Sequence, residues 1–251
     1  MSCNFLKLNS GKTEVVVLGT YQQLAKLNIQ GLSVAGIQVN VQQNPVRNLG
    51  VMFDRNMTME DQVSSIIRSV SYHMRNISRI RRHITADSAK KLIHSLVTSR
   101  LDYCNSLLVG ISGKLMLRLE RAQSWAARII LQLPRSVTPE LHLLHWLPVK
   151  ARVNYKLAVL MFKAIRGPAP EYISSLVSTY CTRRTLRSSD TNLSNVPHSR
   201  HPRAGDRCFK VAGPIMWNKL PNGLRAITDF NTFKKHLKTY LFKDTFYVKR
   251  Q

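Results

Sequence analysis

Apolar residues recur with helical spacing between residues 63 and 77, and this periodicity constrains the fold more than any other feature. They are separated by three or four residues, which places them along one stripe of a helix at 3.6 residues per turn. The stripe contains Val63, Ile66, Ile67, Val70, Met74 and Ile77. A long amphipathic helix is therefore predicted here.

Two further helices are predicted downstream. Thr85 is a favourable N-cap for the first of them. The other begins at Ser112 or Gly113 and continues to about Leu133, where Pro134 stops it. Their apolar faces consist of Ala89, Leu92, Ile93, Leu96 and Val97 in one, and Leu115, Leu119, Ala122, Ala126 and Ile129 in the other. Three consecutive amphipathic helices predict a small helical bundle.

Basic side chains form stripes on two of these helices. On the first helix, on the side opposite the apolar stripe, they are Arg68, Arg75, Arg79 and Arg82. On the third helix they are Lys114, Arg118, Arg121 and Arg128. Arg81 instead falls over the apolar stripe. Such faces are often only solvated, but acids are scarce on both helices and guanidinium groups bind phosphate oxygens bidentately. We therefore predict that the two stripes contact nucleic acid and position a strand without reading its sequence.

The chain carries a formal net charge of +25, from 38 Lys and Arg against 13 Asp and Glu. Thirteen basic and four acidic residues give residues 61–135 a net +9, and fifteen and four give residues 181–251 a net +11. A globular chain this basic repels itself unless polyanions neutralise it. The expected partner is RNA, an RNA–DNA hybrid or DNA, and no small-molecule substrate is expected.

The sequence shows neither a membrane span nor a secretory signal. No apolar run approaches the ~18 residues of a membrane span. An anionic membrane surface is the weaker alternative to nucleic acid, because no basic amphipathic helix stands alone at a terminus, so no membrane partner is expected. The first nine residues lack the layout of a secretory signal, and the four cysteines show no disulfide pattern. We expect a nuclear or cytoplasmic protein, and the basic runs would permit nuclear entry.

The two ends of the chain have different predicted structures. Residues 1–60 are nearly neutral, with five basic and three acidic side chains. Residues 15–18 form an apolar run ended by Gly19, as in a buried strand. Residues 32–41 alternate loosely beside Gly31 and Gly36, which predicts paired strands. Residues 136–251 are predicted to be mostly helical, with a last helix capped by Thr228. The whole chain is therefore predicted to be α+β.

Four short strings occur in a fixed order along the chain. They are Asn-Phe-Leu-Lys-Leu-Asn at 4–9 followed by Lys-Thr-Glu at 12–14, Asn-Leu-Gly-Val at 48–51, the string at 99–108 that contains Leu-Asp-Tyr-Cys-Asn-Ser, and Trp-Asn-Lys-Leu-Pro at 217–221. Together they resemble the C-terminal part of a LINE-type (non-LTR) retrotransposon reverse transcriptase. The resemblance covers residues 1 to about 243. It implies a partial palm with a small antiparallel sheet (1–55), a helical thumb (56–135) and a basic tail domain (136–251).

The resemblance also implies roles for individual residues. In this family the Lys-Thr-Glu string directly follows the catalytic aspartate pair, so the pair and the rest of the palm and fingers would precede this chain. Lys12 matches the palm lysine near the incoming nucleotide, but it would be idle here. Leu49, Gly50 and Val51 match the primer grip. Magnesium would be required only by the intact parent, an RNA-directed DNA polymerase.

The residues themselves offer little for catalysis or metal binding. Two-metal nucleotidyl transfer needs clustered carboxylates, whereas the adjacent pair Glu60 and Asp61 stands where a helix begins. Residues 102–104 are expected to pack or cap. Four candidate zinc ligands are spaced more widely than in most structural zinc sites: Cys181, His198, His201 and Cys208.

We therefore predict a chain without catalytic, metal or cofactor sites that binds nucleic acid. Its parent would be a polymerase, and the chain alone would be inactive. The alternative is a host basic RNA-binding or ribosome-associated protein without catalysis. A structural protein that interacts through its helices is a third interpretation.

Overall fold

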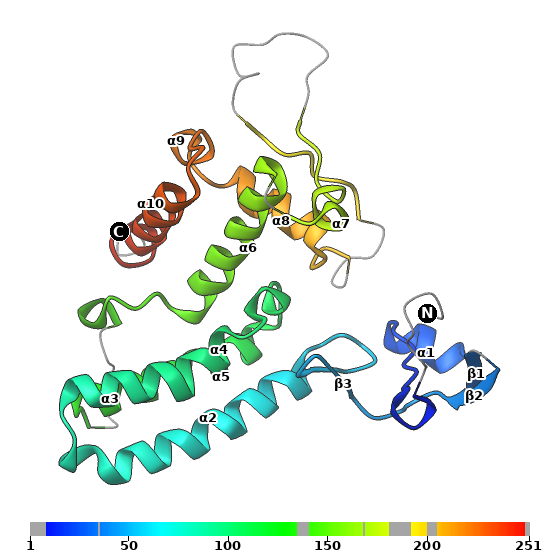
Figure 1. Ribbon diagram of the computed structural model, residues 1–251, viewed down its shortest axis with the longest axis horizontal. Coiled ribbons are helices and arrows are strands. Elements are labelled where there is room, and N and C mark those ends of the chain that lie inside the picture. The colour runs from blue at the N-terminus through cyan, green and yellow to red at the C-terminus, as the bar shows by residue number, and fades with distance from the viewer. Residues whose placement is uncertain are drawn as a thin grey trace. The chain divides into compact units, whose positions relative to one another are not determined.

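The chain forms two compact units, Met1–Arg68 and Ser69–Gln251, and the boundary between them falls inside helix α2. The computed structural model describes residues 9–34, 36–134, 141–167, 169–180, 192–199 and 205–248. Figure 1 shows the elements of each unit. The predicted division at residues 55 and 135 concerns descent from a polymerase and stays a prediction.

Two short antiparallel hairpins and a short helix make up most of the first unit. The strands β1 (Gly31–Val34) and β2 (Ile37–Asn40) pair with each other, as predicted, and β3 (Val46–Asn48) pairs with β4 (Val51–Phe53). A 3-10 turn, η2 (Ser10–Lys12), and α1 (Tyr21–Lys26) precede them. These small sheets, together with the helices described below, confirm the α+β class.

The prediction of a buried strand at residues 15–18 is wrong. Only Val15 makes a bridge, with Val41, and Leu18 is half exposed. A strand needs a neighbouring strand that supplies ladder hydrogen bonds along its length. In this segment the neighbour contributes one such bond, from the Gln42 N–H to the Val15 carbonyl at 2.7 Å.

The turn of the second hairpin explains the local sequence at residues 48–51. Asn48 pairs with Val51, so Leu49 and Gly50 form the two-residue loop. Both have positive φ, 46° and 82°. Two successive positive φ angles match the type I′ turn that suits the twist of paired strands. Gly50 therefore has a conformational reason to be glycine in this turn.

Helix α2 spans Glu60–Ile80 and confirms the first predicted helix. Glu60 and Asp61 lie in its first turn, as predicted. Just before the helix, the Asp54 carboxylate accepts hydrogen bonds from the backbone N–H groups of Thr58 and Met59, at 2.8 and 2.7 Å. Of the predicted apolar stripe, Ile67 is half-buried and the other members are buried.

A helical bundle continues from α2 in the second unit. Its elements are the 3-10 turn η3 (Arg81–His83), α3 (Ala86–Ile93), the π-helical turn η4 (His94–Thr98), α4 (Ser99–Asp102), the 3-10 turn η5 (Asn105–Leu108) and α5 (Gly113–Leu131). The segment from α3 to α4 runs back along the bundle, and α5 then runs in the same direction as the second half of α2 (Figure 1). The bundle core in this unit contains Val70, Met74, Ile77, Ala89, Ile93, Val97, Leu115, Leu119, Ala122, Ala126 and Ile129.

The predicted helix starts of the bundle are confirmed. The Thr85 hydroxyl accepts from the Ser88 N–H at 3.1 Å, and the Ser112 hydroxyl accepts from the Leu115 N–H at 3.4 Å. The end of α5 comes two residues earlier than predicted. Gln132 adopts a left-handed conformation, φ 53°, and this ends the helix before Pro134 acts.

The rest of the second unit is also mostly helical. In chain order its elements are the 3-10 turn η6 (Leu141–Leu144), α6 (Val149–Arg166), α7 (Glu171–Ser174), α8 (Phe209–Asn218), α9 (Asn222–Arg225), α10 (Phe230–Lys243) and the π-helical turn η7 (Asp244–Val248). Asp229, not Thr228, caps α10, since its carboxylate accepts from the Thr232 N–H at 2.6 Å. This hydrogen bonding holds the pKa of Asp229 below its usual value.

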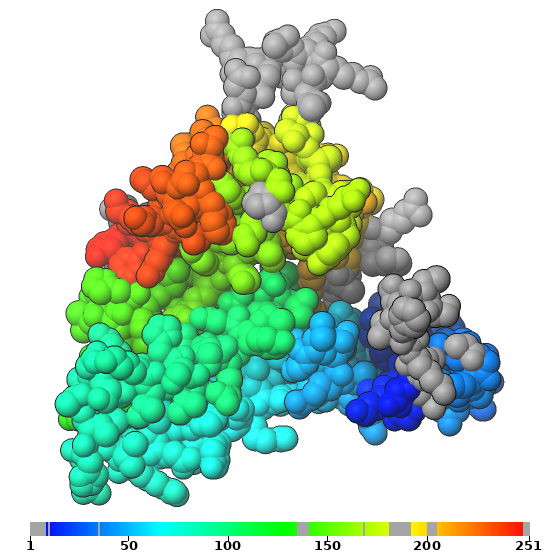
Figure 2. Space-filling view, viewed as in Figure 1, coloured from blue at the N-terminus to red at the C-terminus, as the bar shows by residue number. Residues whose placement is uncertain are grey.

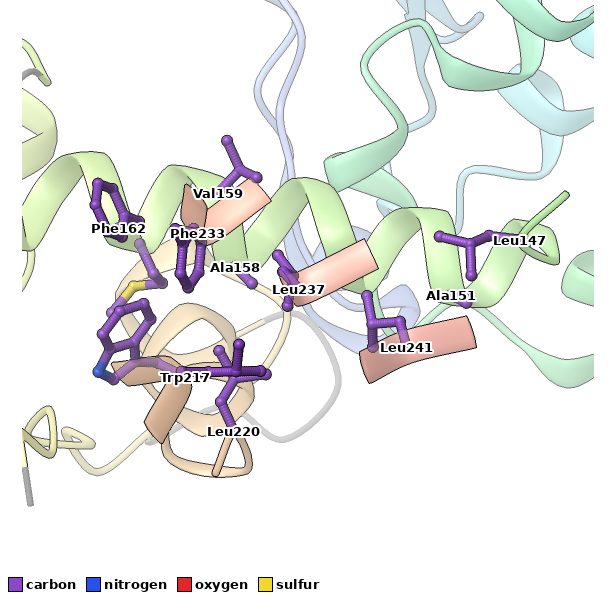
Figure 3. Close-up of a cluster of buried hydrophobic side chains, with 12 residues drawn as sticks. Leu147, Ala151, Ala158, Val159, Phe162, Trp217, Leu220, Phe233, Leu237 and Leu241 are labelled. Atoms are coloured by element: carbon purple, nitrogen blue, oxygen red, sulfur yellow. The ribbon is translucent and has the colours of Figure 1, made fainter. Parts of the chain in front are cut away.

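Helices α6, α8 and α10 share one hydrophobic core (Figure 3). Phe162 of α6 stacks on Phe233 of α10 with ring centroids 4.5 Å apart, and Trp217 of α8 lies 5.8 Å from Phe233. The Trp217 indole N–H donates to the Asn192 carbonyl, and the Asn218 amide bonds both backbone groups of Ser194. The Trp-Asn-Lys-Leu-Pro string is therefore a packing and anchoring element.

Side chains fill the spaces that separate the ribbons of α3, α5 and α6 in Figure 1, as the space-filling view shows (Figure 2). None of the described helices is long and apolar enough to cross a membrane.

Candidate nucleic-acid interface

Three members of the two predicted basic stripes, Arg75, Arg79 and Arg128, line one open groove in the second unit. The groove has a volume of about 510 Å³ and lies between the second half of α2 and the second half of α5. Its lining residues are Arg75, Ser78, Arg79, Arg81, Trp125, Arg128, Ile129, Gln132 and Leu133. We call it the α2–α5 groove. None of these lining residues is acidic.

Helical geometry explains why these residues share the groove. On α2, Arg75, Ser78 and Arg79 are separated by three and four positions, which places them on one face. On α5, Trp125, Arg128 and Ile129 are likewise separated by three and four positions. The spacing in the sequence therefore places the lining residues on one short face of each helix, and each face carries arginine.

Arg81 is a structural anchor among the lining residues of this groove. Its guanidinium donates to the carbonyls of Ile129 and Ile130, both at 2.9 Å, and to the carbonyl of Ile84 at 3.0 Å. Ile129 and Ile130 belong to the last turn of α5, whose carbonyls lack helical partners. A cation there also complements the helix dipole. This agrees with the prediction that Arg81 lies over the apolar stripe.

Three other arginines of the groove are unanchored. Arg75, Arg79 and Arg128 make no hydrogen bond or ion pair with any residue in the described ranges. Arg75 and Arg79 are exposed, whereas the Nε atom of Arg128 is shielded from solvent and unsatisfied. Like charges four residues apart on a helix destabilise it by roughly 0.2–0.5 kcal/mol. A bound anion would relieve this repulsion and accept hydrogen bonds from the exposed guanidinium groups of Arg75 and Arg79.

The other predicted contact residues do not line the groove. Lys114, Arg118 and Arg121 lie on the first half of α5, where Arg118 is half-buried and the other two are exposed. Arg82 is exposed in η3. Arg68 is exposed on the part of α2 that belongs to the first unit.

Trp125 is a groove residue that the sequence reasoning missed. The predicted stripe on α5 contains Lys114, Arg118, Arg121 and Arg128, at offsets of 0, 4, 7 and 14. Trp125 occupies the offset of 11 that completes the series. An aromatic residue at the helical spacing of a basic stripe is therefore the sequence signal that identifies Trp125.

The polymerase-like residues of the first unit are placed as follows. Lys12 is exposed at the end of η2. In the second hairpin, Leu49 is 84% exposed at the loop and Val51 is buried in β4. Their predicted roles beside a nucleotide and a primer stay predictions.

The Leu-Asp-Tyr-Cys string packs and caps, as expected. The Asp102 carboxylate accepts from Arg152 Nη1 at 2.8 Å, which links α4 to α6. Tyr103 is exposed at the C-cap position of α4, and Cys104 adopts a left-handed conformation, φ 49°, before η5. This string therefore connects helices of the second unit.

Candidate metal ligands are only partly described. Cys181 and His201 lie outside the described residues, and His198 and Cys208 are exposed. Within the described part of the chain, no group of three or more His, Cys, Asp or Glu side chains could hold a metal ion.

His73 modifies the electrostatics of α2. Its imidazole is half-buried, and burial lowers its pKa below the usual value, with the charge of Arg100 contributing in the same direction. Its ring lies edge-on to that of Tyr72, with centroids 5.3 Å apart. The positive charge of the α2 face therefore comes from arginine at neutral pH.

Comparisons with protein-family models, with curated proteins and with solved structures found no match to this chain. The resemblance to LINE-type reverse transcriptases therefore rests on the four sequence strings.

Proposed function

We propose that this chain binds nucleic acid through the α2–α5 groove, as a fragment of a retrotransposon RNA-directed DNA polymerase without catalytic aspartates. The observation that carries the proposal is the convergence of Arg75, Arg79 and Arg128, unanchored, in a groove without an acidic lining residue. The partner would be RNA, an RNA–DNA hybrid or DNA.

Charge chemistry supports a phosphate backbone as the ligand. Arginine presents five donors in a planar fork that fits phosphate oxygens, and it stays charged at any physiological pH. Each neutralised phosphate releases counterions, so binding driven this way weakens steeply with salt. The net +25 of the chain adds long-range attraction for the same partner.

The bundle from α2 to α5 would correspond to a polymerase thumb, which lies along the primer–template duplex. Lys12 and the loop at Leu49 and Gly50 would be remnants of the palm. They would help to position a strand, whereas nucleotidyl transfer in this family depends on the aspartate pair that holds two metal ions. The parent enzyme, not this fragment, would use magnesium.

The test compares two doubly substituted full-length chains with equal charge loss. The first carries Arg75→Ser and Arg79→Ser in the groove. The matched control carries Lys150→Ser and Lys156→Ser, both exposed on α6 and outside the groove. Affinity is measured by titration with an RNA–DNA primer–template and with single-stranded RNA over a salt series.

The groove variant should lose affinity and have a shallower log–log salt slope. The expected change is ~0.9 for each lost phosphate contact on duplex and ~0.7 on a single strand. The control should lose little of either. Equal losses in both variants would contradict the proposal, because binding would then depend on total charge. Such a result would favour a generic basic RNA-binding protein.

A further inference from the structure

The α2–α5 groove has an aromatic wall as well as a basic one. Trp125 lies three residues before Arg128 on α5, and its half-buried indole lines the groove. The chain contains three tryptophans, all of them described. Trp146 and Trp217 are buried, at 7% and 0% exposure, so Trp125 alone presents a partly accessible ring.

The polar edge of Trp125 is unused. Its indole N–H makes no hydrogen bond with any residue in the described parts of the chain, whereas the Trp217 N–H donates to the Asn192 carbonyl at 2.9 Å. Tryptophan N–H groups usually find a partner when they are buried. Beside it, Arg128 Nε is shielded and also unsatisfied. The groove therefore offers a π face together with unused donors.

We infer that the α2–α5 groove binds an unpaired nucleotide of a single strand, with its base stacked on Trp125 and the adjoining phosphates held by Arg75, Arg79 and Arg128. This rests on the proposed function and adds what the groove recognises. Every base has a π face, so stacking of this kind tolerates any sequence. A base inside a duplex is already stacked on its neighbours, so Trp125 would take a base from an unpaired stretch, such as the single-stranded template beside a primer–template duplex.

Size and charge agree with this occupant. A volume of about 510 Å³ lies within the usual range of small-molecule sites, ~300–1,000 Å³. The lining combines arginine for the phosphodiester with one aromatic ring for the base, which is the usual composition of single-strand binding surfaces. A carboxylate-rich peptide would use the arginines but leave the indole without a stacking partner.

The test uses the intrinsic fluorescence of the full-length chain. It is titrated with oligo(U), with oligo(dU) and with an abasic sugar–phosphate strand of the same length. A base stacked on Trp125 should quench the emission of that residue. Trp146 and Trp217 are buried, so their emission should change little when a strand binds. Either base-bearing strand supports the inference by quenching, and the stronger of the two identifies the preferred sugar. The abasic strand should bind more weakly and should not quench.

Two substitutions at Trp125 complete the test. Trp125→Ala should lower the affinity for base-bearing strands by roughly 5- to 150-fold, which corresponds to the loss of one stacked base. The affinity for the abasic strand should be unchanged. Trp125→Phe should recover most of this affinity and abolish the quenching. A thermal melt of each variant verifies folding, and Lys156→Ser is the control that should quench like the original chain.

Three results would overturn the inference in distinguishable ways. If oligonucleotides bind without quenching the fluorescence, and with no higher affinity than the abasic strand, then nucleic-acid binding is supported and base stacking is wrong. If polyglutamate quenches and competes as well as the oligonucleotides do, the groove is an acidic-peptide site. If no strand binds at all, the proposed function itself is wrong.

Discussion

Arginines in the second unit fall into anchored and unanchored kinds, and this difference separates structure from proposed function. Arg81 donates hydrogen bonds to three backbone carbonyls. Arg75 and Arg79 also line the α2–α5 groove but have no partner among the described residues. Charge and spacing in the sequence do not show this difference between neighbours. It depends on which carbonyls the folded chain leaves without helical partners.

Arg81→Ala should destabilise the chain by roughly 1.5–3 kcal/mol, because it removes charge-assisted hydrogen bonds and leaves carbonyls at the end of α5 unsatisfied. Denaturant unfolding measures the change. The adjacent Arg82→Ala removes an exposed side chain and should change stability by less than about 0.5 kcal/mol. Equal effects of the two substitutions would show that Arg81 is not an anchor.

His73 should make stability depend on pH. Its pKa is lower in the folded chain than the usual 6.5, so the unfolded chain binds more protons between those two pKa values. Stability should therefore rise with pH through this window and fall as the solution is acidified below about pH 6.5. Unfolding free energies measured from pH 5 to 8 should vary less in His73→Gln. An unchanged pH profile in that variant would contradict the assignment.

At the scale of elements, buried polar side chains hold neighbouring helices together. Gln123 is 2% exposed on α5, where its amide donates to the Leu147 carbonyl at 2.8 Å and accepts from the Val149 N–H at 3.1 Å. Val149 is the first residue of α6, and its N–H has no partner within that helix. Gln123 therefore caps α6 from α5.

Gln123→Leu should destabilise the chain by roughly 1–3 kcal/mol, because it leaves the Val149 N–H unsatisfied. The Leu147 carbonyl keeps a hydrogen bond from Arg152 Nε at 2.8 Å. Denaturant unfolding followed by circular dichroism measures this. Arg121→Leu, exposed on the same helix, is the control and should have little effect on stability. If Gln123→Leu were as stable as the control, the capping role would be excluded.

The elements that could be predicted from sequence are those whose packing imposes a period. The apolar stripe from Val63 to Ile77 and the caps Thr85 and Ser112 were readable because burial and capping depend on local spacing. The prediction of a strand at residues 15–18 is wrong because the pairing of this run depends on a distant segment. The groove was half predicted: its arginines follow helical spacing, whereas the meeting of α2 and α5 is tertiary.

At the scale of the whole molecule, apolar exposure is uneven along the chain. The first unit exposes several large apolar side chains on its described surface: Leu18, Tyr21, Leu27, Ile29, Leu32, Ile37 and Leu49. Each of its sheets has only two strands, so every strand presents an edge. Exposed edges and apolar faces promote association between chains.

We therefore expect Ile37→Lys, in β2, to reduce aggregation of the full chain, because a charged edge opposes strand addition. Light scattering over a concentration series measures it. Tyr172→Lys adds the same charge at an exposed position in the second unit and is the control. If both substitutions reduced light scattering by the same amount, net charge rather than the strand edge would be responsible.

The central claim is that nucleic acid occupies the α2–α5 groove, although residues 181–251 carry a comparable excess of charge. The most direct measurement is photocrosslinking of a 5-bromouridine-substituted strand to the full chain, followed by peptide mapping. Crosslinks should be concentrated at Trp125 and in the segments at 75–81 and 121–132. Crosslinks confined to residues 181–251, or spread evenly over basic residues, would contradict the claim.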